Sequence, residues 1–115
     1  MQQATSKIEI QNEFCIVTRW TFPPQTATGW HRHEKNYVVV PTISGELTIM
    51  HFDGSEVKAE MVAGNPYARS VGVEHDVQNR STSMVEFLEI EIIQKAGEWD
   101  GRDETLTMEG AKISP

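Results

Sequence analysis

The fold is decided by two stretches of the chain, GWHRHEKNYVVVPTISG at residues 29–45 and GNPYARSVGVEHDVQN at residues 64–79. In each, β-branched and aromatic residues form short runs bounded by glycine, proline or asparagine, which is typical of strands joined by tight turns. Residues 37–40 predict one strand, which Pro41 closes because proline has no N–H to donate within a sheet. Residues 71–77 predict another strand, so both stretches indicate β-structure.

The flanking sequence continues this pattern. Large apolar residues fall on even positions between residues 8 and 22, which predicts a half-buried strand run. The residues concerned are Ile8, Ile10, Phe14, Ile16, Trp20 and Phe22. Asp53-Gly54 predicts a hairpin turn, and further strands are predicted at residues 47–52, 56–62 and 84–93. Because no helical stripe of apolar residues is found, we predict an all-β sandwich or barrel.

The length favours one domain. The chain has 115 residues, of which 38% are hydrophobic, enough for one core. We expect the barrel to occupy residues 1–93. Residues 94–115 form an acid-rich C-terminal extension, for which two interpretations stand: a loosely held terminus, or a strap that packs Trp99 on the body or on a second subunit.

Charge and cysteine content narrow the function classes. Seventeen acids against ten bases give a net charge of −7, which disfavours nucleic acid and anionic membrane surfaces as partners. The apolar runs are far shorter than the about 20 residues of a spanning helix, and the first residues lack a secretory apolar segment. Cys15 is the one cysteine, so no internal disulfide is expected, which favours a cytoplasmic location.

Three of the four histidines stand in informative positions. His31 and His33 are two residues apart, so on a strand both rings project from one face as half of a metal site. His75 shares its strand face with Val73 and Val77, and a buried histidine needs a partner or a ligand role. A surface pair and a hydrogen-bonded core histidine are the alternatives when each is taken alone. Together the three predict a metal site.

The second stretch resembles the second motif of the cupin family, G-x5-P-x-G-x2-H-x3-N. Gly64, Gly72, His75 and Asn79 match it in register, and Ser70 stands where proline is usual. The first stretch resembles the first cupin motif, G-x5-H-x-H-x3/4-E-x6-G. The resemblance covers most of residues 20–92, and in detail the chain is similar to small single-domain cupins of the β-alanine degradation group.

The first motif also shows departures from the cupin pattern. His31, His33 and Gly45 match, but Gln25 replaces the first glycine and Tyr37 stands where the ligand glutamate is expected. One extra residue lies between Tyr37 and Gly45, which suggests a bulge. The resemblance therefore implies a small jelly-roll barrel, the cupin double-stranded β-helix, with a three-histidine metal site at His31, His33 and His75. It also implies a homodimer.

Three neutral imidazoles leave a divalent ion its full charge, so such a site favours anionic ligands and keeps open positions for catalysis. We expect a metal-dependent, dioxygenase-like enzyme using iron(II) on a small carboxylate-bearing metabolite. Zinc, nickel or manganese are alternative metals. A zinc or manganese lyase or isomerase and a non-catalytic binding or sensing module are alternative functions. Tyr37 is expected to orient the ligand, Arg69 to pair with its carboxylate and Trp30 to line an apolar pocket.

Overall fold

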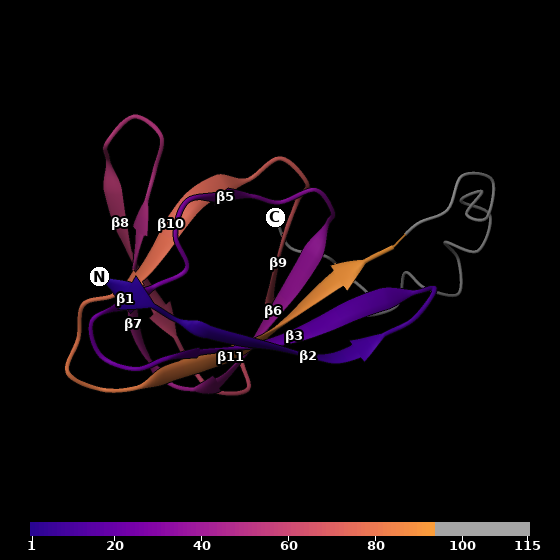
Figure 1. The fold of residues 1–115 in the computed structure, drawn as a ribbon, viewed down its shortest axis with the longest axis horizontal. Helices are drawn as coiled ribbons and strands as arrows, with labels where there is room; N and C mark the ends of the chain where they lie inside the picture. The colour runs from indigo at the N-terminus through magenta and orange to yellow at the C-terminus, as the bar shows by residue number, and fades with distance from the viewer. Residues whose placement is uncertain (94–115) are drawn as a thin grey trace.

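Two antiparallel β-sheets make up the computed structural model, which describes residues 1–93 (Figure 1). One sheet has the order β2 (Thr5–Gln11), β3 (Cys15–Phe22), β11 (Val85–Ile92), β6 (Tyr37–Ile43) and β9 (Tyr67–Arg69). The other has the order β1 (Gln2–Gln3), β4 (Thr26–Ala27), β10 (Glu74–Asn79), β7 (Gly45–Met50) and β8 (Glu56–Met61), with β5 (His31–Arg32) beside β10. The pairings are antiparallel except that of β1 with β4. The prediction of an all-β jelly-roll barrel is confirmed.

Residues 1–93 contain no helix, and the described part of the chain therefore has none long and apolar enough to cross a membrane. The predicted extension at residues 94–115, with Trp99, lies outside the described residues.

The core lies between the two sheets. Phe22 of β3 and Val85 of β11 are fully buried on one side, and Leu47 of β7 is fully buried on the other. Along β11 the buried positions alternate with half-buried ones, as expected for a strand that has one face turned to the core. The third buried position of β11 is an acid, Glu89.

The prediction of one strand run from residue 8 to residue 22 is wrong. The chain turns after Gln11, and β2 pairs back on β3 as a hairpin. The Asn12 side chain drives this turn, because its Oδ1 accepts from the backbone N–H groups of Phe14 at 2.7 Å and Cys15 at 3.0 Å. Residues 8 and 10 consequently lie on an exposed edge strand.

Pro41 does not close its strand as predicted, because β6 runs through it to Ile43. The Pro41 carbonyl accepts a hydrogen bond from Gly64 N–H at 2.8 Å. It therefore points away from β11, to the side of β6 where the pairing with β9 has already ended. The missing N–H of Pro41 faces this same side, so no bond to β11 is lost. The predicted extra residue is present, since Pro41 faces Phe87 while Ile43 faces Glu86, leaving one bulged residue between them.

Candidate metal centre

Three histidines from two sheet segments meet at one end of the barrel. β5 pairs antiparallel with β10 so that His31 lies opposite His75. The segment after β5 is fixed by two backbone hydrogen bonds of 2.8 Å, from His33 N–H to Val73 O and from Gly72 N–H to His33 O. Gly72 has a φ of +99°, a conformation that glycine adopts without steric cost. The turn before β10 therefore locks His33 beside the His31–His75 pair.

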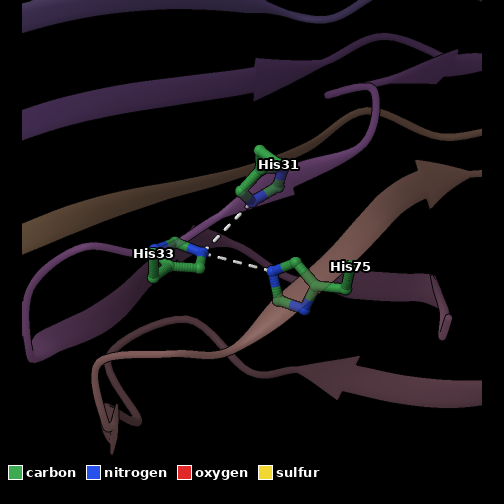
Figure 2. A group of neighbouring side chains, drawn as sticks. All are labelled: His31, His33 and His75. Carbon is green, nitrogen blue, oxygen red and sulfur yellow. Dashed lines mark hydrogen bonds between the residues drawn. The ribbon is translucent and has the colours of Figure 1, made fainter.

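The three rings point their Nε2 atoms toward a common point (Figure 2). His33 Nε2 lies 3.1 Å from His31 Nε2 and 3.2 Å from His75 Nε2. Nitrogen ligands at about 2.0–2.1 Å from one ion would be separated by about 3.0–3.4 Å in tetrahedral or octahedral geometry. The two separations from His33 match those of ligands that share one ion, and the ligand atoms of the three rings all lie within 4.8 Å of one another.

Hydrogen bonding at the far side of two rings fixes where their protons lie. His31 Nδ1 is 2.9 Å from Gly29 O, which only accepts, so Nδ1 carries the proton and Nε2 presents a lone pair. His33 Nδ1 points toward the carboxylate of Glu89, with 3.4 Å to Oε2, which favours the same tautomer. Two lone pairs then face each other at 3.1 Å, an arrangement that a shared cation relieves. The donor set fits a divalent metal ion.

Burial keeps two of these rings neutral. It lowers the pKa of His33 to about 4, with further contributions from His31 and Arg69. It lowers the pKa of His75 to about 3, with contributions from His31, His33 and Arg69. Neutral imidazole is the form that binds metal, so both rings are in the ligand state at pH 7.

The three histidines open into a cavity of about 290 Å³ between the two sheets. Most of its wall is apolar and comes from both sheets. The apolar lining includes Val39, Leu47, Ile49, Met61, Val77 and Phe87. A second hollow also reaches His31 and His33, and its lining includes the charged residues Arg32, Glu34, Lys35 and Glu91.

Tyr37 and Arg69 both line this cavity, as expected of ligand-binding residues. They are paired across β6 and β9. The Tyr37 ring is buried and stacks on the His33 ring, with centroids 3.8 Å apart and planes 15° apart. Burial raises the pKa of Tyr37 well above its ordinary value, so the phenol stays protonated. The structure therefore brings both residues to the histidines.

Trp30 does not join this group. Its side chain is 47% exposed and does not line the cavity. The indole N–H donates to Glu74 Oε2 at 2.6 Å, and the ring packs near Phe52 on the outside of the barrel. Trp30 is adjacent to His31 in sequence, and strand alternation turns neighbouring side chains to opposite faces.

Glu89 is a residue of the site that the sequence did not predict, and Trp20 is its hydrogen-bond partner. Glu89 is 9% exposed and accepts from Trp20 Nε1 at 3.2 Å. Burial, with Glu91 nearby, raises the pKa of Glu89 to about 7. The available signal was parity, because Val85, Phe87 and Glu89 share one face of a single strand.

Asn79, the last residue of the second motif, holds a turn instead of touching the cavity. It is fully buried, and its Nδ2 donates to Phe22 O at 2.9 Å and Ser83 O at 2.8 Å. Its Oδ1 accepts from the backbone N–H of Ser81 at 3.0 Å. Asn79 therefore ties the loop between β10 and β11 to the end of β3.

Comparison with known proteins agrees with this geometry. Residues 18–91 match the family described as the cupin domain. The chain is 44% identical to the β-alanine degradation protein BauB of Pseudomonas aeruginosa over 90 residues, which cover 78% of this chain and 94% of that one. It is 27% identical to an oxalate-binding protein of Thermotoga maritima over 93 residues, covering 81% and 74% respectively.

A solved structure of a cupin domain from Bordetella pertussis is also similar. It superposes with a TM-score of 0.77 at 43% identity, over 81% of this chain and 96% of that one. The matched residues contain the three histidines and most of the cavity wall. The family match, the shared barrel and the identity to these relatives lead to one conclusion: this chain belongs to the cupin family.

Proposed function

We propose that the chain is a metal-dependent enzyme that acts on a small carboxylate-bearing metabolite. His31, His33 and His75 would hold the ion, and the cavity would hold the metabolite. The observation that carries this proposal is the convergence of three imidazole Nε2 atoms on a cavity that also contains Arg69. A cation site and a guanidinium on the same wall suit an anionic ligand.

Each residue around the ligand has a distinct role in this proposal. The Arg69 guanidinium would pair with the ligand carboxylate, because arginine presents two N–H groups to two oxygens. Tyr37, which burial keeps protonated, would donate a hydrogen bond to the ligand. The apolar wall would exclude water from the rest of the ligand.

The names of the relatives support the ligand class. β-Alanine and oxalate both carry carboxylates, and the two curated relatives are named for degradation of the one and binding of the other. These names belong to the relatives, and they favour a carboxylate for this chain as well.

The metal determines which reaction follows. Bound iron(II) would supply dioxygen chemistry, whereas zinc or manganese would supply Lewis-acid chemistry of the lyase or isomerase kind. We favour iron(II) and oxidation, because three protein ligands leave open positions on the ion at which dioxygen and the metabolite could bind together. A non-catalytic binding module is the second candidate, favoured by the relative that is named a binding protein.

Elemental analysis tests the proposal. Untagged protein should contain close to one equivalent of iron, zinc, nickel or manganese, and the double variant His31→Ala/His75→Ala should contain none. Oxygen consumption with β-alanine-like carboxylates would then separate oxidation from Lewis-acid chemistry. If wild type binds neither iron(II) nor zinc after reconstitution, the metal-dependent function is wrong. If metal is bound and exchangeable but no carboxylate turns over, the binding module replaces the enzyme.

A further inference from the structure

A buried carboxylate stands directly behind the metal-binding face of His33. Glu89 projects from β11 into the barrel and is 9% exposed, although acids are almost never buried without partners. Its Oε1 accepts from Trp20 Nε1 at 3.2 Å, and its Oε2 lies 3.4 Å from His33 Nδ1. Its two oxygens therefore serve two different rings.

In this contact, His33 is the donor and Glu89 is the acceptor. Its Nε2 is the atom that points at His31 and His75, so its Nδ1 carries the proton when Nε2 binds an ion. A proton at Nδ1 needs an acceptor, and Oε2 of Glu89 is a charged acceptor 3.4 Å away. A carboxylate in this place holds the ring orientation and makes the imidazole a stronger ligand.

We infer that Glu89 is a positioning residue of the metal centre, supplying from behind His33 the negative charge that Tyr37 does not supply as a ligand. The inference rests on the proposed metal site. Glu89 would be a carboxylate that does not itself bind the ion. The ion therefore keeps its open positions while its charge is partly balanced. Trp20 fixes the carboxylate by occupying its other oxygen.

Glu89→Gln removes the charge and leaves the volume of the side chain unchanged. A glutamine oxygen accepts from either Trp20 or His33, and its NH₂ group opposes the other donor. We expect cobalt(II) and zinc affinity, measured by competition with a chelator, to fall 10- to 100-fold. The visible absorption of bound cobalt(II) should shift as the His33 ring reorients. Melting temperature is recorded alongside, so that loss of folding is not mistaken for loss of affinity.

Two matched variants separate positioning from other effects. Trp20→Phe removes the hydrogen bond that fixes the other oxygen of Glu89, so metal affinity should fall, but by less than in Glu89→Gln, because the carboxylate itself stays beside His33. Glu46→Gln removes one carboxylate from an exposed position outside both hollows and should change metal affinity by less than about threefold. The inference is overturned if Glu89→Gln binds cobalt(II) as wild type does. It is also overturned if Glu46→Gln loses as much affinity as Glu89→Gln, because net charge alone would then account for the loss.

A measurement on the unsubstituted protein covers the case in which Glu89→Gln does not fold. In zinc-loaded wild type, the His33 Nδ1 proton should give a downfield, slowly exchanging NMR resonance, because a carboxylate shields it from water. Absence of that resonance overturns the inference. Absence of zinc binding by wild type would instead reject the proposed metal site itself.

Discussion

The proposed pairing of Arg69 with the ligand carboxylate predicts a contribution to ligand binding that is separate from that of the metal, and a substitution of Arg69 tests it. Arg69→Gln should weaken binding of acetate or oxalate to the cobalt(II)-loaded protein by about tenfold or more, since a hydrogen bond to a charged group contributes about 1.5–3 kcal/mol. Azide binds the metal without using a carboxylate clamp, so its affinity should change little. Both affinities are read from the cobalt(II) absorption.

The control for Arg69→Gln is Arg32→Gln. Arg32 is exposed, pairs with Glu34 at 3.5 Å and carries the same charge. A fall in carboxylate affinity that is equal in both variants would mean that net charge, and not the Arg69 contact, attracts the ligand.

The buried side chain of Asn79 stabilises the fold and does not contact the cavity. Asn79→Ala removes the hydrogen bonds that the Asn79 amide donates to the carbonyls of Phe22 and Ser83, and we expect the free energy of unfolding to fall by about 2–4 kcal/mol. Urea denaturation measures this. Asn65→Ala, at an exposed turn, should change stability by less than about 0.5 kcal/mol. Equal losses in the two variants would contradict the role given to Asn79.

At the residue scale, the sequence predicted the residues whose spacing follows a motif. It did not predict residues whose partners are brought together only by the fold. The H-x-H pair and His75 were found because parity and motif spacing placed them together. Trp30 was misplaced although the same parity rule turns it away from His31. Glu89 was missed because an acid in an apolar strand reads as an exposed residue until its partners, 56 and 69 positions earlier in the chain, are known.

At the element scale, the close approach of two strand starts depends on Gly45. A Cβ added there would lie 2.5 Å from Cγ2 of the fully buried Val85. Gly45→Ala should therefore destabilise the fold by about 1–3 kcal/mol through overpacking. Adding Val85→Ala should recover part of this loss, because it removes the clashing methyl groups. Chemical denaturation gives the free energy of unfolding of each single variant and of the double variant, and from these the coupling energy between residues 45 and 85.

The comparison for Gly45→Ala is Gly64→Ala. Gly64 has a φ of +83° and nothing within 4 Å of the added Cβ, so its cost is backbone strain alone. That cost, about 1–2 kcal/mol, should be unaffected by Val85→Ala. Additive behaviour of Gly45→Ala with Val85→Ala would contradict the packing explanation.

Strand existence was easier to predict than strand ends. The Asp53-Gly54 turn and the strands beside it follow from local chemistry, and the structure places β7 and β8 there. The turn at Asn12 was missed because apolar residues kept the same parity on both sides of it. Pro41 was misjudged because tolerance of proline depends on which side of β6 has a neighbour, and that is a property of the sheet.

At the scale of the whole molecule, the homodimer stays a prediction. β2 is an edge strand with Ile8 56% and Ile10 50% exposed, and such edges are commonly covered by another chain. Sedimentation equilibrium should give twice the mass of one chain. Lys substitution of Ile8 and Ile10 together should shift the mass to that of a monomer, if this edge forms the contact.

The stability of the metal-free protein should depend on pH through the buried histidines. In the folded state the pKa is about 4 for His33 and about 3 for His75, against about 6.5 for an unfolded histidine. Between pH 6.5 and 4 the unfolded chain therefore binds protons that the folded chain excludes. Stability from these groups is complete above pH 6.5 and is lost as the pH falls.

Glu89 acts in the opposite direction. Its folded pKa of about 7 exceeds its ordinary value of 4.5, so its contribution to stability is present below pH 4.5 and is lost as the pH rises through 7. Acidification should therefore still destabilise the protein, by a net amount on the order of a few kcal/mol, because two histidines oppose one carboxyl.

Urea denaturation in the presence of a chelator, at pH 7.5 and pH 4.5, measures this dependence. His33→Gln/His75→Gln removes both titrating rings, so the stability of wild type relative to this variant should fall as the pH is lowered. Groups that the two proteins share cancel in that difference. Parallel profiles for the double variant would mean that the two site histidines accept protons without cost, and that burial does not hold them in the metal-binding form.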